Sequence, residues 1–294
     1  MAQSSREIKR RIASISSTQQ ITSAMEMIAA AKLRRAQEQV LNARPYFERM
    51  WDSLGLILHT LQAEGVELSG AGLETEGGAD GHCLLVFTSD RGLAGGYNAA
   101  IIRRAEAFLQ ENPATQMVIV GRKARDHFRR RRQTFLAEFA NLGDDPTWRR
   151  GEEIARMILD FYEHGLFNRV TILYTKFINT VTHRVTLRTV LPVPTEQGYK
   201  QEVGDGLNSL YLFEPSPQAA LQSLIPLYVR AAIYESLVEA KASELGARMA
   251  AMRNATDNAG ELIRELNITY NRARQAQITR EIAEIVGGAD ALES

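Results

Sequence analysis

The residues best placed to do chemistry form a glycine-rich turn, TSDRGLAGGYN, at positions 88–98. The turn follows an apolar run and precedes a helical pattern, which is where the free N–H groups of a helix start bind phosphate. Its glycines read G-x-x-G-G, whereas a dinucleotide loop has the spacing G-x-G-x-x-G. Arg122 and Lys123, which follow the next apolar run, could suit a 2′-phosphate. Two interpretations stay open: the nucleotide- or NADPH-binding site of an oxidoreductase, or a tight turn that binds nothing.

Other reactive side chains are scattered along the chain. The five histidines show no metal-binding spacing such as H-E-x-x-H, and no Ser/His/Asp or Cys/His arrangement is recognisable. The single cysteine, Cys83, excludes an internal disulfide and a cysteine-based metal site. We therefore expect a chain without catalytic residues, metal or other cofactor, in a reducing compartment.

A basic run at positions 122–132 contains seven Lys or Arg residues and one Asp. Nucleic-acid-binding faces interleave such cations with aromatic residues, whereas Phe128 is the only aromatic residue in this run. The run is more typical of a solvated helix face, or of a face that meets an acidic partner. We expect no nucleic-acid partner.

Short apolar runs alternate with helical patterns in the middle of the chain. Strands are expected at 83–88, 116–121, 134–139, 170–177, 181–190 and 209–213. Helices are expected at 97–111 and 152–164, with a helix or turn at 122–132. Strands that alternate with helices predict a largely parallel sheet covered by helices on both faces.

Two much longer helical stretches enclose this region, at 5–61 and 217–286. The first is interrupted only at Pro45, and the second contains no proline after Pro226. At 1.5 Å per residue, about 70 helical residues extend on the order of 100 Å, which is longer than a compact domain of this size. We therefore expect the second helix to project from the globular part of the chain.

Each long stretch has a seam of apolar and small residues with a period near 3.5, typical of helices that supercoil on a partner. The first seam contains Ile8, Ile12, Ile15, Gln19, Thr22, Glu26, Ala29, Leu33, Ala36 and Val40. The second contains Val238, Ala242, Leu245, Met249, Met252, Thr256, Ala259, Ile263, Leu266, Tyr270 and Ala273. An ordinary pair of core helices is the alternative, but both stretches exceed the usual length of roughly 8–20 residues. Because the middle of the first seam is polar or small, the helices either pack very closely there or leave the seam partly wet.

The predicted fold is α/β: a long antiparallel coiled coil of the N- and C-terminal helices, with an inserted Rossmann-like α/β domain. Its segments are a coiled-coil helix at 1–61, a linker at 62–81, an α/β globular domain at 82–216 and a coiled-coil helix at 217–294. The 294 residues have zero formal net charge and are 45% hydrophobic and 24% charged, as in ordinary soluble proteins. The sequence contains no run of 18 apolar residues and begins without an apolar signal core, so we expect no membrane span.

Four segments resemble the γ subunits of F-type ATP synthases in their bacterial form. They are ITSAMEMIAAAKLRRAQ at 21–37, TSDRGLAGGYN at 88–98, ASELGARMAAMRNATDNA at 242–259 and YNRARQAQITREI at 270–282. The segments occur in the family's order and cover both ends and the middle, so the resemblance extends over nearly the whole chain. The sequence lacks the cysteine-bearing regulatory segment of the chloroplast form and a transit peptide.

This resemblance implies a non-catalytic subunit that is the central rotor shaft of the F1Fo ATP synthase. In that family the coiled coil fills a ring of three α and three β subunits, and the globular part sits with the ε subunit on the membrane-embedded c-ring. Proton flow turns the c-ring and the shaft, and the shaft drives the β subunits through ATP synthesis or hydrolysis. The implied location is peripheral, on the cytoplasmic face of the bacterial cell membrane. A plain coiled-coil scaffold stays open beside the nucleotide-binding enzyme.

The resemblance also implies contacts with the α/β ring at Met25, Arg248, Arg274, Gln275 and Thr279. Met25 matches the family position close to an acidic loop of a β subunit, and Arg248 matches an arginine of the same coupling contact. Arg274, Gln275 and Thr279 match polar positions near the shaft tip that bond to the ring.

Side chains near the end of the second helix suggest how such a shaft avoids sticking in its ring. Polar residues outside the seam are expected to project outward: Arg264, Glu265, Asn267, Asn271, Arg272, Arg274, Gln275 and Gln277. Three isoleucines, at 278, 282 and 285, recur at helical spacing after the seam has shifted. They face a smooth apolar collar of the ring as a bearing, or they pack on the start of the first helix, at Ile8, Ile12 and Ile15.

Overall fold

The computed structural model describes residues 5–63, 81–141, 143, 146–180, 182–193 and 213–293, without the side chains of 62, 63 and 287–293. The predicted linker at 62–81 lies mostly outside these residues. The predicted strand at 209–213 lies outside them except for Phe213.

The two terminal helices are more continuous than expected. α1 covers Ser5–Ala63 and α5 covers Pro217–Glu293. The predicted interruption at Pro45 was wrong, because α1 continues through this residue. Proline lacks the N–H that would bond the carbonyl of Leu41, but both residues are exposed, so water can reach that carbonyl instead. Over the described residues, no helix combines the length and the apolar character that crossing a bilayer requires.

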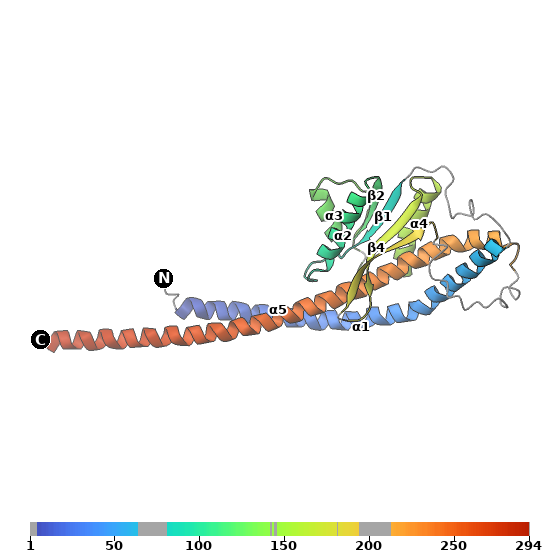
Figure 1. Cartoon of the computed structure of the whole chain (residues 1–294). Coiled ribbons are helices and arrows are strands. Elements are labelled where there is room, and N and C mark those ends of the chain that lie inside the picture. Colours follow the sequence, from blue (N-terminus) through green and yellow to red (C-terminus); the bar gives the residue numbers. More distant parts are fainter. Residues whose placement is uncertain are drawn as a thin grey trace. The chain divides into compact units, whose positions relative to one another are not determined.

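A five-stranded sheet forms from the middle of the chain (Figure 1). Its strands are β1 (His82–Phe87), β2 (Thr115–Val120), β3 (Ala137–Phe139), β4 (Arg169–Phe177) and β5 (His183–Leu191). They lie in the order β3-β2-β1-β4-β5, and only the β4–β5 pair is antiparallel. The prediction of a largely parallel sheet is confirmed. The exception follows from the short connection between β4 and β5, since a parallel pair needs a long crossover.

Alternate side chains of β1 enter two separate cores, as the two-residue period of a strand requires. Leu84 and Val86 pack with α2 (Tyr97–Glu111) and α3 (Arg122–Arg130). Leu85 and Phe87 belong to the other core, with side chains from three helical segments: α4 (Trp148–Glu163), residues 50–61 of α1 and residues 221–240 of α5. The expected helices on both faces are confirmed. Parts of the two terminal helices pack on one face of the sheet. The periodicity of their seams did not predict this packing.

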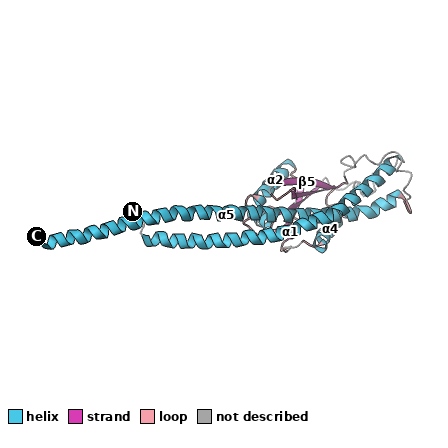
Figure 2. Cartoon of the chain, turned by 90° about the horizontal axis from the view of Figure 1, so that it is seen from below, coloured by secondary structure: helices cyan, strands magenta, loops and turns pink. Residues whose placement is uncertain are grey.

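The chain divides into two compact units. The larger unit contains residues 30–247, with the sheet, α2, α3, α4 and the adjoining parts of α1 and α5. The smaller unit contains residues 1–29 and 248–294. There the start of α1 runs beside α5, and the last part of α5 extends beyond it, in both views (Figures 1 and 2); we call this unit the helical pair. The four segments expected from the sequence stay a prediction about domain boundaries.

Candidate partner-contact surface

Polar side chains fix the register of the helical pair. The Ser5 hydroxyl donates a hydrogen bond to Gln277 Oε1 at 3.0 Å. Further along, the Thr256 hydroxyl donates to the Thr22 hydroxyl at 2.8 Å, and the Gln19 amide donates to the Thr256 carbonyl at 3.4 Å. Two antiparallel helices therefore align Ser5 with Gln277 and Thr22 with Thr256.

The predicted seam is the contact surface of this pair. Ile8, Ala29, Met252 and Ala259 are buried, and a second group is half-buried: Ile12, Ile15, Ile263, Leu266, Tyr270 and Ala273. In the small and polar middle, a Cβ added to Gly260 would lie only 3.1 Å from Gln19 Nε2. Of the two possibilities left open for this part of the seam, close packing is the one observed.

α5 continues past the paired segment to Glu293. Ile278, Ile282 and Ile285 are 45%, 56% and 72% exposed. Because Ser5 lies beside Gln277, Ile8 is aligned one turn before Gln277 along α5, on the side away from these isoleucines. The interpretation that they pack on Ile8, Ile12 and Ile15 is therefore wrong within the described residues.

The five residues expected to contact the ring all lie in the helical pair. Met25 and Arg248 are half-buried, whereas Arg274, Gln275 and Thr279 are exposed. The Thr279 hydroxyl donates to the Gln275 carbonyl at 2.9 Å, which places the two residues one turn apart on the same side of α5. The structure thus brings together Arg274, Gln275 and Thr279 at one end of the pair, and Met25 and Arg248 lie nearer its other end.

The outer side of α5 in this unit is mostly polar, with Leu262 and Ile268 as exposed apolar exceptions. Every polar residue that was expected to project outward is exposed: Arg264, Glu265, Asn267, Asn271, Arg272, Arg274, Gln275 and Gln277. Ile282 lies one turn beyond Thr279, and Ile278 lies one turn beyond Arg274. The end of α5 therefore carries exposed polar and apolar side chains on the same sides of one helix.

The glycine-rich turn at 88–98 accepts hydrogen bonds from the main-chain N–H groups at the start of α3. The Arg122 N–H donates to Asp90 Oδ1 at 3.1 Å, and the Lys123 N–H donates to the carbonyl of the residue before Asp90 at 3.1 Å. The Ala124 N–H donates to the Thr88 hydroxyl at 3.1 Å. The Asp90 carboxylate thus occupies the place that an anionic ligand takes at a helix start.

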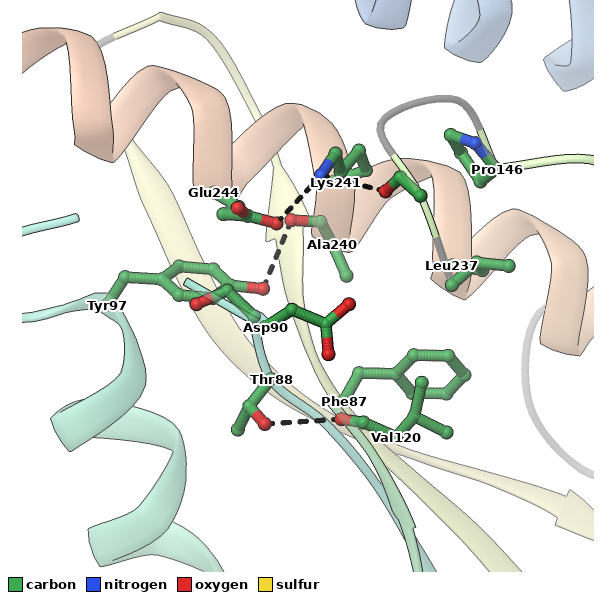
Figure 3. Close-up of a pocket in the computed structure, with 12 residues that line it drawn as sticks. Phe87, Thr88, Asp90, Tyr97, Val120, Pro146, Leu237, Ala240, Lys241 and Glu244 are labelled. Atoms are coloured by element: carbon green, nitrogen blue, oxygen red, sulfur yellow. Dashed lines mark hydrogen bonds and ion pairs between the residues drawn. The ribbon is translucent and has the colours of Figure 1, made fainter. Parts of the chain in front are cut away.

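The same turn also holds α2 and α5. Asn98 Oδ1 accepts a 3.0 Å hydrogen bond from the Ser89 N–H, and the Tyr97 hydroxyl donates to the Ala240 carbonyl at 3.1 Å (Figure 3). Gly121 has a φ of +97°, and a Cβ there would lie 2.1 Å from the Thr88 carbonyl oxygen. Glycine is required at this position because the backbone just before α3 touches the backbone of the turn at Thr88.

A small cavity of about 40 Å³ lies between this turn and α5 (Figure 3). On one side Lys241 Nζ lies 3.3 Å from Glu244 Oε2 and 3.3 Å from the Gly143 carbonyl oxygen. Ligand pockets typically measure about 300 Å³ or more, so this cavity is far too small for a nucleotide. With the α3 start already bonded, the interpretation as a nucleotide- or NADPH-binding site finds no support and is corrected to a structural turn.

Carboxylates next to the basic run neutralise part of it. Glu138 lies 2.8 Å from Arg129 and 3.9 Å from Arg125, while Glu106 pairs with Arg131 and lies 2.8 Å from the His127 ring. These pairs favour the interpretation as a solvated helix face. In the described part of the chain, no three His, Cys, Asp or Glu side chains are arranged to hold a metal ion.

The sequence did not predict a cluster of charged and phenolic groups between α5 and the sheet. It contains Glu235 and Glu239 of α5, Tyr174 of β4 and Arg188 of β5. The only sequence signal is a pair of carboxylates one turn apart on an otherwise apolar helix face. That pattern cannot say which strand residues lie opposite.

Comparisons with known proteins agree over nearly the whole chain. A family described as ATP synthase matches residues 4–292. The protein named ATP synthase gamma chain of Heliobacterium modesticaldum is 46% identical over 291 residues, which is 98% of this chain and 98% of that one. The ATP synthase gamma chain of Symbiobacterium thermophilum is 45% identical over 296 residues, with 100% of each chain covered.

Solved structures share the fold at low sequence identity. A chain from the Euglena gracilis mitochondrial ATP synthase, in an assembly of OSCP, F1 and c-ring, has a TM-score of 0.65 and 20% identity, covering 98% of this chain and 94% of that one. A chain from the central stalk and c-ring of the Tetrahymena thermophila mitochondrial ATP synthase has a TM-score of 0.60 and 24% identity, covering 80% of this chain and 99% of that one.

Proposed function

Because the chain belongs to the family of ATP synthase γ chains, we propose that it is the central-stalk rotor of an F1Fo ATP synthase. It couples proton flow through the c-ring to ATP synthesis or hydrolysis in an α3β3 hexamer by rotation. Its partners are the α and β subunits, the ε subunit and the c-ring. The chain itself is non-catalytic, and the nucleotide chemistry takes place on the other subunits.

One observation carries this proposal: α5 continues beyond its paired segment in the helical pair. Past Gln277, no described residue of α1 lies alongside it, and its isoleucines at 278, 282 and 285 are exposed. Exposed isoleucines at helical spacing on a stable helix are expected to be covered by another chain. A ring that surrounds the end of a shaft is such a cover.

The polar outer side of α5 suits a part that must turn. Burying apolar surface stabilises a contact by about 25 cal/mol per Å². A few hundred Å² of apolar contact at one angle would hold the shaft there by several kcal/mol. Exposed side chains such as Arg264, Asn267 and Gln275 instead make hydrogen bonds that can be exchanged for others with little net change in free energy.

Two kinds of contact follow for the residues carried over from the family. Arg274, Gln275 and Thr279 bond to the ring near the shaft tip, and Ile282 and Ile285 face its apolar collar as a bearing. Met25 and Arg248 form the coupling contact with an acidic loop of a β subunit. Both are half-buried within the helical pair, so each keeps a surface that a partner can reach.

The proposed location is the cytoplasmic face of a bacterial membrane, where the chain is held only through the other subunits. The finding that no described helix could cross a bilayer is consistent with this placement.

Copurification from the native source tests the proposed function. A tagged chain should capture a nucleotide-binding hexamer, and a variant that ends at Gln277 should capture it more weakly. The purified chain alone should show no sustained ATP hydrolysis. Turnover by the chain alone, free of contaminating α and β subunits, would overturn the rotor assignment, and failure to capture any hexamer would leave the scaffold alternative.

A further inference from the structure

Two carboxylates of α5 face the sheet in the larger unit, one of them half-buried and the other buried. Glu235 and Glu239 are one helical turn apart, and Glu239 is only 3% exposed. Charged residues are almost never this buried unless they are paired. Each of the two carboxylates therefore requires a physical explanation.

Glu235 has a cation of its own. Arg188 Nη1 of β5 lies 2.5 Å from Glu235 Oε2, and both side chains are about three-quarters buried, with 28% and 22% exposed. This distance is that of a strong charge-assisted hydrogen bond. The Arg188 guanidinium therefore chiefly neutralises Glu235.

Glu239 lacks such a partner. The Tyr174 hydroxyl of β4 faces its side chain, and Tyr174 is itself 3% exposed. The second carboxyl oxygen, Oε2, is buried and has no hydrogen-bond partner among the described residues. An ionised carboxylate would leave a charged oxygen unpaired in the protein interior, which is more costly than leaving a neutral one.

A cavity of about 10 Å³ adjoins the Glu239 carboxyl group between α1 and α5. Besides the two carboxylates, its lining residues are Val40, Ala43, Arg44, Phe47 and Val238. A space of this size holds at most about one water molecule. The carboxyl group is thus close to a space for a single water molecule, although Glu239 itself is only 3% exposed.

We propose that Glu239 is a proton-binding site, and that its neutral carboxylic acid is the form that fits the contact between α1, α5 and the sheet. The proton removes the charge from the unpartnered oxygen and leaves an O–H that can donate to a water in the cavity. Loss of the proton places a second negative charge beside Glu235, which loosens the contact. This site is separate from the partner-contact surface of the helical pair and does not depend on it.

The groups that face Glu239 come from every neighbouring element. They are Glu235 on α5 itself, Tyr174 and Lys176 on β4, Arg188 on β5 and Arg44 on α1. Arg44 and Lys176 are exposed, so solvent screens much of their attraction for the carboxylate. The cations therefore offset only part of the cost of burying the ionised group.

The pKa of Glu239 is shifted in the direction that this arrangement predicts. Burial raises the pKa of Glu239 from its ordinary value of 4.5 to about 7, and the negative charge of Glu235 adds to the increase. Lys176, Arg44 and Arg188 lower this pKa, but by less. Because the folded pKa is above the unfolded one, the stabilisation from the bound proton is complete below about pH 4.5 and is lost as the pH rises through about 7.

Urea unfolding of the full chain between about pH 5 and pH 8 tests the site. Relative to Glu239→Gln, the wild type should lose about tenfold in its folding equilibrium constant for each pH unit between about 5 and 6.5. Glutamine copies the neutral acid, so this variant should be the more stable protein at about pH 8. Parallel pH profiles for the two proteins would overturn the proposal.

A second pair of variants tests the same site from the surface of α1. Arg44→Gln removes a cation that favours the ionised form, so the midpoint of the wild-type titration should move to higher pH. Arg49→Gln, also exposed on α1, should leave the midpoint unchanged. A protonated-carboxyl infrared band that disappears on raising the pH through 7 should be present in the wild type and absent from Glu239→Gln; a band of equal size in both proteins would contradict the assignment.

Discussion

The Tyr97 hydroxyl donates a 3.1 Å hydrogen bond to the main-chain carbonyl of Ala240. This bond joins the first residue of α2 to the first third of α5 across 143 positions of the sequence. It lies in a turn whose other polar groups bond to Val120 of β2, to Asn98 of α2 and to the start of α3. The turn that looked most like a ligand loop is therefore a junction at which four elements of the larger unit meet.

Replacement of Tyr97 by Phe tests this junction. The ring would keep its packing, since Tyr97 is only 7% exposed, and the hydroxyl bond alone would be lost. The free energy of unfolding should fall by about 1 kcal/mol, the net contribution of one buried hydrogen bond. Urea unfolding provides the measurement, and Tyr46→Phe, at an exposed site, should leave the stability unchanged. Equal stability of both variants would mean that the bond contributes nothing.

A series of glycine substitutions tests the close approach of Gly121 to the backbone of Thr88. Gly121→Ala forces a Cβ to within 2.1 Å of the Thr88 carbonyl oxygen at a φ of +97°, so we expect a loss of about 3 kcal/mol or more. Gly165→Ala meets no neighbouring atom but has a φ of +69°, and should cost about 1 kcal/mol. Gly96→Ala, with open space and a φ of −81°, should be nearly neutral. Chemical denaturation of the three variants measures this order, and any other order would contradict the steric argument.

Hydrophobic periodicity predicted most of the described elements of this fold, but it left 122–132 as a helix or turn and extended β3 to 134–139. The apolar runs at β1, β2 and β4 and the helical pattern at Tyr97–Glu111 depend on local spacing, which the sequence displays directly. The continuity of α1 through Pro45 could not be predicted in this way, because it depends on whether water reaches the carbonyl of Leu41. The sequence also could not predict that Asp90 binds the start of α3, since its partner is the N–H of Arg122, 32 positions away.

The candidate contact surface was predictable only in part. Outward polar residues such as Asn271 and Gln275 follow from the period of the seam, because the seam defines the opposite side of the helix. Whether α1 covers Ile282 depends on where α1 begins alongside α5. A one-turn shift in that register moves each isoleucine by about 5.4 Å along the partner, and the sequence does not specify the register.

A cation at position 25 tests the proposed coupling contact. Met25→Lys would place a charge beside an acidic loop of the β subunit in a partly desolvated site, where the pair should exceed the roughly 0–1 kcal/mol of an exposed pair. A contact that is stronger at one angle resists leaving it, so the protons pumped per ATP hydrolysed should fall while the complex still assembles. Ala24→Lys adds the same charge at the neighbouring, exposed position and should affect pumping less. Normal coupling in Met25→Lys would count against this contact.

Charges at Ile282 and Ile285 test the proposed bearing. Both side chains are more than half exposed and lie past the segment that α1 covers, so an aspartate at either position should leave the thermal stability of the isolated chain almost unchanged. In the assembled complex the same aspartates would have to enter an apolar collar without a partner, which costs several kcal/mol or excludes the helix from it. Subunit dissociation on dilution and the rate of ATP hydrolysis by the complex report this loosening.

Ile8→Asp is the matched control, because Ile8 is 1% exposed within the helical pair and the charge should lower the melting temperature of the isolated chain by several degrees. If the assembled complex stays as stable and as active as the wild type with Ile282→Asp and with Ile285→Asp, the isoleucines are not the bearing surface.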